Sequence, residues 1–253
     1  MKYEIVKKLA EVLEGVTLFR IRALVDIPKI GVKAGDLGGW IEEESNLSQE
    51  DNCWIYGGAR VHGDAQVFGN AQVCDDAQVC GNARVFGNAW IYGGARVHGD
   101  AQVFGNARVR ENAWIYGNAR VHGDAQVFGN AQISGNTRIY GDARVHGNAQ
   151  ICGNAWIFEN AWIYGDARIY GNAWVSGNAH MSKTTDVITI SPIGSENGTL
   201  TAFRNSDGGI SVTRGCFSGT LEEFEIAVEK KHGNNQHGVV YRSFVNAIKL
   251  QLG

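Results

Sequence analysis

From Ile55 to His180 the sequence repeats every six residues, in the pattern Val/Ile–x–Gly–Asn/Asp–Ala–x, without an insertion or a deletion. The first position is Val or Ile in all 21 units, and the fifth is Ala in every unit except the one that carries Thr137. Gly fills the third position in 18 units, and the exceptions are Asp75, Glu111 and Glu159. A short fixed period is typical of a stacked array, in which each unit buries its apolar side only against its neighbours.

A period of six does not fit an α-helix, whose apolar positions recur at three and four residues. It fits a short strand followed by a tight turn, because the Ala and the Val or Ile are two residues apart and face inward together, while the two variable residues face outward. Gly–Asn and Gly–Asp adopt positive φ readily and can turn the corner. Three such sides close a triangular coil of eighteen residues, so the 21 units predict about seven coils, roughly 33 Å tall at about 4.7 Å per coil.

Two segments around the start of the repeat carry a resemblance to a known family: Val32–Trp40, VKAGDLGGW, and Asn46–Tyr56, NLSQEDNCWIY. With the hexapeptide spacing, they make residues 15 to 180 similar to the YdcK-like β-helix proteins found in bacteria and in phages or prophages. The resemblance implies a left-handed parallel β-helix, which is the hand of hexapeptide-repeat proteins. It implies no particular biochemical activity.

The fold class predicted for the whole chain is mainly β, with an N-terminal cap over residues 1–45, the β-helix over 46–182 and a small α+β domain over 183–253. In the cap, Ile5–Leu13 has the apolar spacing of a short amphipathic helix, and Val16–Ile27 alternates as one or two strands do. The cap is expected to cover the open end of the β-helix and to enter the first coil through Gly38-Gly39-Trp40.

The C-terminal domain is predicted to contain three strands followed by two helices. The strand candidates are Asp186–Ile193, Gly198–Arg204 and Gly209–Arg214. A capping box, Thr220-Leu221-Glu222-Glu223, opens the first helix, which runs to about Lys231, and the second helix spans Val239–Leu250. Capping of the β-helix, assembly and a ligand site are all open as roles for this domain.

The composition limits the classes of function. The net charge is −3 and no run of eighteen apolar residues occurs, so neither a long nucleic acid nor a membrane is an expected partner. The five Cys are scattered and odd in number, which argues against a disulfide framework and favours a cytoplasmic location. No CxxC or HxxxH spacing occurs, so neither a metal nor a cofactor is expected.

Function is expected on the outward positions, because only Val, Ile and Ala point inward. Residues eighteen apart stack on one face, and all nine Lys or Arg residues between positions 53 and 182 are Arg. Arg beside aromatic rings suits a ligand whose phosphate is held while its base stacks. The expected ligand-binding residues are Arg84, Arg120, Arg138, His122, Tyr140, Trp156 and Phe158.

One outward column consists of rings and is expected to stack with itself: Phe68, Phe86, Phe104, His122, Tyr140 and Phe158. Such a ladder stabilises the coils without any ligand. A long apolar stripe also indicates a subunit interface, which we place at Phe68, Phe86 and Phe104. By analogy with left-handed β-helix proteins, a homotrimer is the favoured assembly.

An acyltransferase is the rival enzymatic interpretation, because many hexapeptide β-helices have that activity and use a His as general base. No loop interrupts the coils here, and segments 54–71 and 90–107 are identical, which favours array duplication over a tuned site. Four histidines of the repeat lie in copied Val-His-Gly-Asp/Asn units: His62, His98, His122 and His146.

Two weaker alternatives lie in the C-terminal domain. Cys216 with His232 or His237 has the residue types of a nucleophile and its base. The segment Arg214–Thr220 leads into a helix N-terminus, where amides and an Arg can hold an anion, but a plain strand-to-helix turn with Thr220 as the cap is the favoured interpretation. No catalytic residue is therefore assigned.

The sequence predicts a non-enzymatic, oligomeric β-helix protein that sequesters a small anionic aromatic ligand. A host nucleotide immune signal, captured by a phage-encoded anti-defence protein acting as a sponge, has that chemistry. The alternative is a scaffold or inhibitor that binds a host protein through the same surface.

Overall fold

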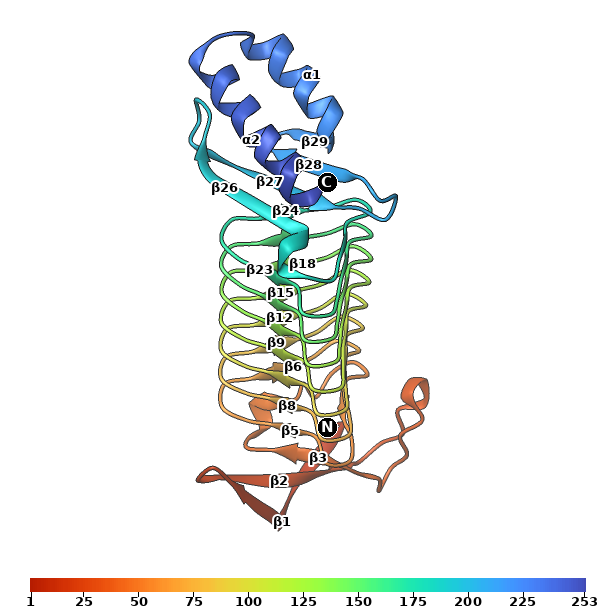
Figure 1. Cartoon of the computed structure of the whole chain (residues 1–253). Helices are drawn as coiled ribbons and strands as arrows, with labels where there is room; N and C mark the ends of the chain where they lie inside the picture. Colours follow the sequence, from red (N-terminus) through yellow and green to blue (C-terminus); the bar gives the residue numbers. More distant parts are fainter. The chain divides into compact units, whose positions relative to one another are not determined.

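The computed structural model describes all residues, 1–253, and divides into two compact units, Met1–Gly135 and Asn136–Gly253. The chain is mainly β, a β-solenoid of about eight turns with parallel sheets and a small C-terminal α+β part (Figure 1). The division falls inside the six-residue repeat, so both units contain coils of the same kind.

The first unit begins with three longer strands, β1 (Tyr3–Leu13), β2 (Val16–Ala23) and β3 (Leu37–Ile41), and short 3-10 helices at Pro28–Ile30 and Glu44–Asn46. Two-residue strands follow: β4 (Trp54–Ile55), β5 (Arg60–Val61), β6 (Gln66–Val67), β7 (Gln72–Val73), β8 (Gln78–Val79), β9 (Arg84–Val85), β10 (Trp90–Ile91), β11 (Arg96–Val97), β12 (Gln102–Val103), β13 (Arg108–Val109), β14 (Trp114–Ile115), β15 (Arg120–Val121), β16 (Gln126–Val127) and β17 (Gln132–Ile133). They form three parallel stacks, β3-β5-β8-β11-β14-β17, β4-β7-β10-β13-β16 and β6-β9-β12-β15. Every third strand pairs, as a three-sided coil requires.

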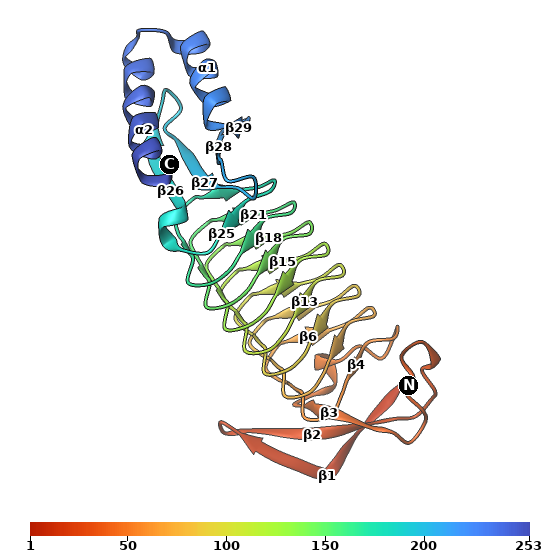
Figure 2. The same cartoon turned by 45° about the vertical axis from the view of Figure 1, so that its right-hand side comes forward.

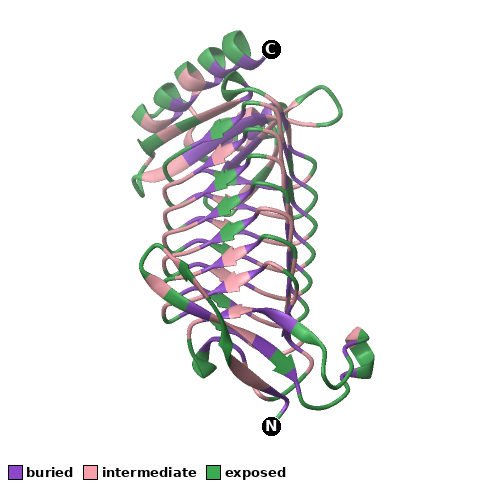
Figure 3. Ribbon diagram, turned by 90° about the horizontal axis from the view of Figure 1, so that it is seen from below, coloured by how far each residue is buried: buried purple, intermediate pink, exposed green.

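The inward positions of the repeat form the core of the coils. From Ala59 to Val175 every Ala and every Val or Ile at these positions is at most 1% exposed. In Figure 3 the strands accordingly alternate between buried and more exposed residues. Equivalent side chains stack in register, for example Val61 beside Val79 and Val97 beside Ile115. Full burial of a Val or Ile side chain contributes about 1.5–3 kcal/mol, so the ladder is the main source of stability.

The corners of the coils need positive φ, and the repeat supplies it in two ways. Most corners use Gly, such as Gly105 with φ 70°. Three corners use an acid with φ 58–61°, and each carboxylate accepts the backbone N–H of the Gly eighteen residues later: Asp75 from Gly93, Glu111 from Gly129 and Glu159 from Gly177. The left-handed conformation costs about 1–2 kcal/mol, and a hydrogen bond to a charged group contributes about 1.5–3 kcal/mol. The acid thus offsets the strain that it introduces.

The N-terminal segment corrects one sequence prediction. The helix expected over Ile5–Leu13 is wrong, because these residues lie in β1, which pairs antiparallel with β2 and places Ile5 opposite Ile21. Pairing with a partner strand overrides the local helical spacing, and several β-branched residues in the segment favour the extended form. The strand predicted within Val16–Ile27 is confirmed as β2.

The solenoid also starts earlier than the repeat itself. β3 pairs in parallel with β5, with Trp40 opposite Arg60, so the chain has about eight turns rather than the seven predicted from the hexapeptide units alone. Gly38 and Gly39 permit this close approach. An added Cβ would lie 2.7 Å from the Ile55 carbonyl oxygen at Gly38 and 2.6 Å from the Ala59 carbonyl oxygen at Gly39.

The second unit continues the two-residue strands with β18 (Arg138–Ile139), β19 (Arg144–Val145), β20 (Gln150–Ile151), β21 (Trp156–Ile157), β22 (Trp162–Ile163), β23 (Arg168–Ile169), β24 (Trp174–Val175) and β25 (His180–Met181). Within it the stacks are β18-β21-β24, β19-β22-β25 and β20-β23. After a 3-10 helix at Thr184–Asp186, the chain forms β26 (Val187–Ile193), β27 (Gly198–Arg204), β28 (Ile210–Arg214), β29 (Phe217–Thr220), α1 (Leu221–His232) and α2 (Gln236–Leu252). β26 to β29 make an antiparallel sheet in sequence order.

The C-terminal elements agree with the sequence prediction, with one addition. The three predicted strands and both helices are confirmed, and Thr220 and Glu223 form the expected capping box. β29 was not predicted, because it is a short edge strand whose pairing with β28 is not visible in a local pattern. Neither helix combines the length and the apolar character that crossing a membrane would need.

The α+β part has its own core and covers the last coil. α1 and α2 lie side by side against the sheet (Figures 1 and 2), and their buried residues, such as Phe224 of α1 and Tyr241 of α2, share one core with Leu200 and Val212 of the sheet. The Thr213 hydroxyl donates to the Trp174 carbonyl at 2.6 Å, and the Ser206 N–H donates to the Asn178 carbonyl at 2.9 Å. The exposed backbone edge of the final turn is thereby satisfied, so capping is one role of this part.

Candidate functional site

Most arginines of the coils have no acidic partner. Arg60 pairs with Glu11, and Arg110 pairs with Glu111. No carboxylate lies within ion-pair distance of the other seven: Arg84, Arg96, Arg108, Arg120, Arg138, Arg144 and Arg168. Their guanidinium groups therefore retain donors that a bound anion can use.

The acids of the coils are engaged elsewhere, at the corners. Asp100 accepts from the Asn82 side chain at 2.9 Å, and Asp166 accepts from the Asn148 side chain at 3.0 Å. These bonds belong to ladders of Asn and Asp that run from coil to coil. The acids thus lie at the corners, and most arginines lie in the strands, so the two kinds of charge are separated on the coils.

In the first unit the predicted ring column is a continuous stack. The ring centroids are 4.8 Å apart between Phe68 and Phe86, 4.7 Å between Phe86 and Phe104, and 4.6 Å between Phe104 and His122, with interplanar angles of 2–8°. All four rings are half-buried. Such stacking stabilises neighbouring coils, as expected for a cross-strand ladder.

Arg84 lies against this stack. Its guanidinium carbon is 5.3 Å from the Phe68 centroid and 5.8 Å from the Phe86 centroid. Arg84 and Phe68 also line a shallow groove of about 290 Å³ with Ser45, Ser48 and Gln66. The groove therefore combines a cation, a ring face and hydroxyl groups.

Arg120 occupies the same face as Arg84. The parallel register places Gln102 between the two arginines, which keeps the like charges two coils apart. At about 4.8 Å per coil, that spacing is roughly 10 Å. Arg120 is exposed, and the neighbouring ring column ends in this unit at His122.

In the second unit the structure brings four predicted site residues together. The Arg138 guanidinium carbon lies 4.6 Å from the Trp156 ring centroid. Tyr140 stacks on Phe158 at 5.1 Å and 4°, and meets Trp156 edge-on at 6.4 Å. Arg138 and Trp156 are half-buried, so the cluster presents a cation held over an indole beside a stacked pair of rings.

The Tyr140 hydroxyl is neutral in this cluster. Burial raises the pKa of Tyr140 above its usual value of 10.0, the Glu159 carboxylate raises it further, and Arg138 opposes the shift. A neutral hydroxyl can donate a hydrogen bond to a ligand oxygen and does not repel an anion. In this cluster the charge of Arg138 favours an anionic partner, and the charge of Glu159 opposes one.

Trp174 extends this cluster and was not among the predicted site residues. Its ring lies 5.5 Å from Trp156 and 5.9 Å from Phe158, and it is 40% exposed. The eighteen-residue period that places Trp174 above Trp156 was the signal that could have found it. The identical copies Trp54 and Trp90 show the limit of that signal, because Trp54 is 1% exposed and Trp90 is 44% exposed.

The histidines of the coils are packed among rings. His98 stacks on Tyr116 at 5.2 Å, His122 stacks on Phe104, and His146 accepts a hydrogen bond from the Trp162 indole. In the C-terminal part, Cys216 and His232 line one cavity, and His232 lies 5.8 Å from His237 between ring centroids. No hydrogen bond joins the Cys216 thiol to either histidine.

The stacked two-residue strands and their parallel sheets define a β-solenoid. A family model described as the YdcK beta solenoid repeat matches residues 77–93, 113–129, 131–147, 149–165 and 167–183. The repeats within residues 77–183 are similar to the YdcK beta solenoid, which confirms the YdcK-like repeat β-helix expected from the sequence. No curated protein matches the chain.

Proposed function

We propose that this protein is a non-enzymatic, oligomeric, cytoplasmic binding protein that sequesters a small anionic aromatic ligand on its coils. A nucleotide signal of a host cell, bound by a phage-encoded protein, is a ligand of this class. The observation that carries the proposal is Arg138, which lies over Trp156 without an acidic partner and beside the Tyr140–Phe158 stack.

This arrangement supports binding of a nucleotide for two physical reasons. A guanidinium stacked on a ring keeps its N–H edge directed outward, where it can pair with a phosphate in a bidentate manner. Stacking of a base on an aromatic side chain contributes about 1–3 kcal/mol and tolerates different bases. A flat surface encloses a small ligand poorly, so the proposal includes a second subunit that closes over it.

The site assignment is tested by calorimetric titration of the full chain with cyclic dinucleotides and with cyclic ADP-ribose-type molecules. We expect Arg138→Ala and Trp156→Ala each to weaken binding by about tenfold or more, corresponding to about 1.4 kcal/mol. Arg168→Ala is the matched control, because Arg168 is an exposed arginine of the same unit with no ring beneath it. Equal affinities in all three variants would show that the ligand does not bind at Arg138 and Trp156.

The oligomer is tested separately through the Phe68–Phe86–Phe104 column. Phe86→Glu combined with Phe104→Glu should lower the mass measured by light scattering to that of a monomer, because two charges then stand in the interface. Gln102→Glu is the control, since it adds a charge on the neighbouring strand β12 without removing a ring. A mass that is unchanged in the double variant would place the interface elsewhere.

A protein-binding scaffold is the second candidate function. Four Trp of the coils are 38–44% exposed, namely Trp90, Trp114, Trp162 and Trp174. Exposed Trp and Arg are the residue types that dominate the energy of protein interfaces. If a host protein is the partner, Trp90→Ala with Trp114→Ala should abolish its co-purification, while nucleotide titrations of the wild-type chain give no heat.

A further inference from the structure

A cavity of about 240 Å³ lies within the C-terminal α+β part. The strand end at Arg214, the edge strand β29 and the facing sides of α1 and α2 form its walls. Its lining includes three aromatic residues, three basic residues and one acid: Phe217, Phe224 and Tyr241, then Arg214, Lys231 and His232, and Glu196. An apolar cavity of about 150 Å³ is enough to hold benzene, so a substituted ring fits here.

Arg214 is fixed in the wall with one end of its guanidinium free. Its Nε donates to the Tyr241 hydroxyl at 3.1 Å, and its Nη2 donates to the Ile193 carbonyl at 2.9 Å. The side chain is 12% exposed, yet Nη1 has no acceptor within hydrogen-bond distance. The nearest carboxylate, on the 78% exposed Glu196, is 3.9 Å away. Nη1 therefore makes only this long ion pair with an exposed carboxylate, which the charged group of a ligand can replace.

Two glycines of the β26–β27 turn make room for this guanidinium. A Cβ at Gly198 would lie 2.6 Å from Nη1, and a Cβ at Gly194 would lie 3.0 Å from Nη2. Any side chain at these positions would push the guanidinium out of its place. The absence of a Cβ at these two positions thus gives the guanidinium its place in the wall.

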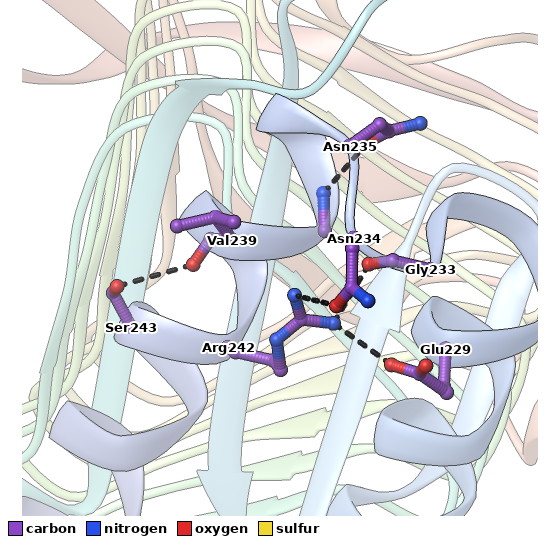
Figure 4. A network of polar contacts seen from close by, with 8 residues as sticks. Glu229, Gly233, Asn234, Asn235, Val239, Arg242 and Ser243 are labelled. Carbon is purple, nitrogen blue, oxygen red and sulfur yellow. Dashed lines mark hydrogen bonds and ion pairs between the residues drawn. The ribbon is translucent and has the colours of Figure 1, made fainter.

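Arg242, in the same part of the chain, shows what a purely structural arginine looks like (Figure 4). Its Nη1 donates to Glu229 at 2.8 Å and to the Gly233 carbonyl at 2.7 Å, and its Nη2 donates to Asn234 at 3.3 Å. These bonds fix the connection between α1 and α2, and Asn235 caps α2 beside them. Both Nη atoms of Arg242 donate hydrogen bonds to the protein, whereas Nη1 of Arg214 has only the 3.9 Å ion pair with the exposed Glu196.

Around Arg214 the cavity carries two further basic side chains, Lys231 and His232, and one carboxylate, that of the exposed Glu196. Lys231 forms no ion pair, although it lines the same cavity. Burial lowers the pKa of His232 below its usual 6.5, and the positive charges of Lys231, His237 and Arg214 lower it further. The lowering by these three charges means that the electrostatic potential at His232 disfavours a further proton and favours an anion.

We infer that this cavity is a binding site for a small aromatic anion, an aryl carboxylate or aryl phosphate, whose charged group pairs with Arg214 and Lys231 and whose ring packs on Phe217, Phe224 and Tyr241. The site is independent of the coil surface proposed above. It uses other residues, and it takes its ligand into a cavity rather than between subunits.

Cys216 provides a local reporter for occupancy, because it lines the cavity and is the one exposed cysteine of the five. The experiment follows alkylation of Cys216 in the full chain by N-ethylmaleimide, quantified by peptide mass spectrometry. The probes are benzoate and phenyl phosphate, with benzyl alcohol as the uncharged ring and inorganic phosphate as the anion without a ring. At a probe concentration ten times its Kd, a ligand that covers the thiol should slow alkylation about tenfold.

Substitutions at two neighbouring lysines of α1 distinguish binding in the cavity from a general effect of positive charge on α1. Lys231→Ala should weaken protection severalfold, and Lys230→Ala, which does not line the cavity, should leave it unchanged. Arg214→Lys should reduce protection further, since one ammonium cannot keep both structural bonds and also pair with the anion. Arg138→Ala should have no effect, which separates failure of this site from failure of the coil site. Alkylation that is insensitive to benzoate and phenyl phosphate, or slowed equally by benzyl alcohol, would overturn the inference.

Discussion

Residues 54–71 and 90–107 have the same sequence but different surroundings. Trp54 is 1% exposed and meets Tyr3 edge-on at 6.3 Å, whereas Trp90 is 44% exposed. Arg60 pairs with Glu11 at 2.6 Å, whereas its copy Arg96 has no acidic partner and lies 4.9 Å from the Trp114 ring centroid. The first copy is covered by β1 and the segments next to it, and the second copy is open.

This difference separates what the repeat encodes from what the rest of the chain adds. The inward residues of both copies are equally buried, so the hexapeptide fixes the coil by itself. The outward residues of the two copies are identical in sequence, and they differ in exposure where another segment covers the first copy. One copy shows these residues serving structure, and the other shows them available to a ligand, a second subunit or a partner protein.

The largest expected difference between the copies is at the tryptophans. Trp54→Ala should lower the free energy of unfolding by about 3–5 kcal/mol, because it empties a fully buried site. Trp90→Ala should change it by less than about 1 kcal/mol, because the ring is half in solvent. Denaturant unfolding monitored by circular dichroism compares the two, and equal losses would mean that the N-terminal segment does not protect the first copy.

The corner glycines should differ by a smaller amount. Gly57 and Gly93 both have positive φ, but a Cβ at Gly57 meets nothing within 4 Å, while one at Gly93 would lie 2.8 Å from the Glu111 nitrogen. Gly57→Ala should therefore cost only the conformational strain of about 1–2 kcal/mol. Gly93→Ala should cost about 1–3 kcal/mol more through overpacking against the next coil. Similar midpoints of thermal unfolding would contradict this account of the corners.

The arginines should differ by still less. Arg60→Ala removes a partly buried ion pair with Glu11, which we expect to cost about 0.5–1 kcal/mol. Arg96→Ala breaks no ion pair and should be close to neutral for stability. A double-mutant cycle with Glu11→Ala isolates the Arg60 contribution. Coupling between Glu11 and Arg96 of the same size would show that the two copies are not distinguished by β1.

The smallest effect is on proton binding at His98. Burial, and after it the charge of Arg96, holds the pKa of His98 below the usual 6.5. The folded protein binds this proton less readily than the unfolded chain, so His98 lowers the free energy of unfolding as the pH falls through the usual His range. NMR titration should show the pKa rising in Arg96→Ala while staying below 6.5, because burial is the larger cause. A wild-type pKa above 6.5 would contradict the assignment.

The coils were predictable because the inward residues of each hexapeptide stack on the equivalent residues of the neighbouring coils. The spacing of Val, Gly and Ala determined the three-sided coil, the stacked column of Phe68, Phe86 and Phe104, and the placement of the acids at corners. β1 was not predictable in the same way, since its conformation depends on pairing with β2 rather than on its own apolar spacing.

The candidate sites differ in the same way: the coil site could be predicted from the repeat, and the Arg214 cavity could not. Arg138 and Trp156 could be placed together from the sequence because they are eighteen residues apart in a regular array. The Arg214 cavity could not, because Lys231 and Tyr241 reach it from two helices and the space for the guanidinium depends on Gly194 and Gly198. Only the segment at Arg214 gave a local signal, and it suggested an anion at a helix N-terminus rather than in a cavity.

Native mass spectrometry of the full chain tests the central claim most directly, because it reports the mass of the oligomer and any bound ligand together. The panel contains cyclic dinucleotides, cyclic ADP-ribose-type molecules and acyl-CoA. The account predicts an oligomer that carries at least one nucleotide, that loses it in the Arg138→Ala, Trp156→Ala double variant and that keeps it in Arg168→Ala. A monomer, an oligomer that binds no nucleotide, or one that binds acyl-CoA alone would contradict it.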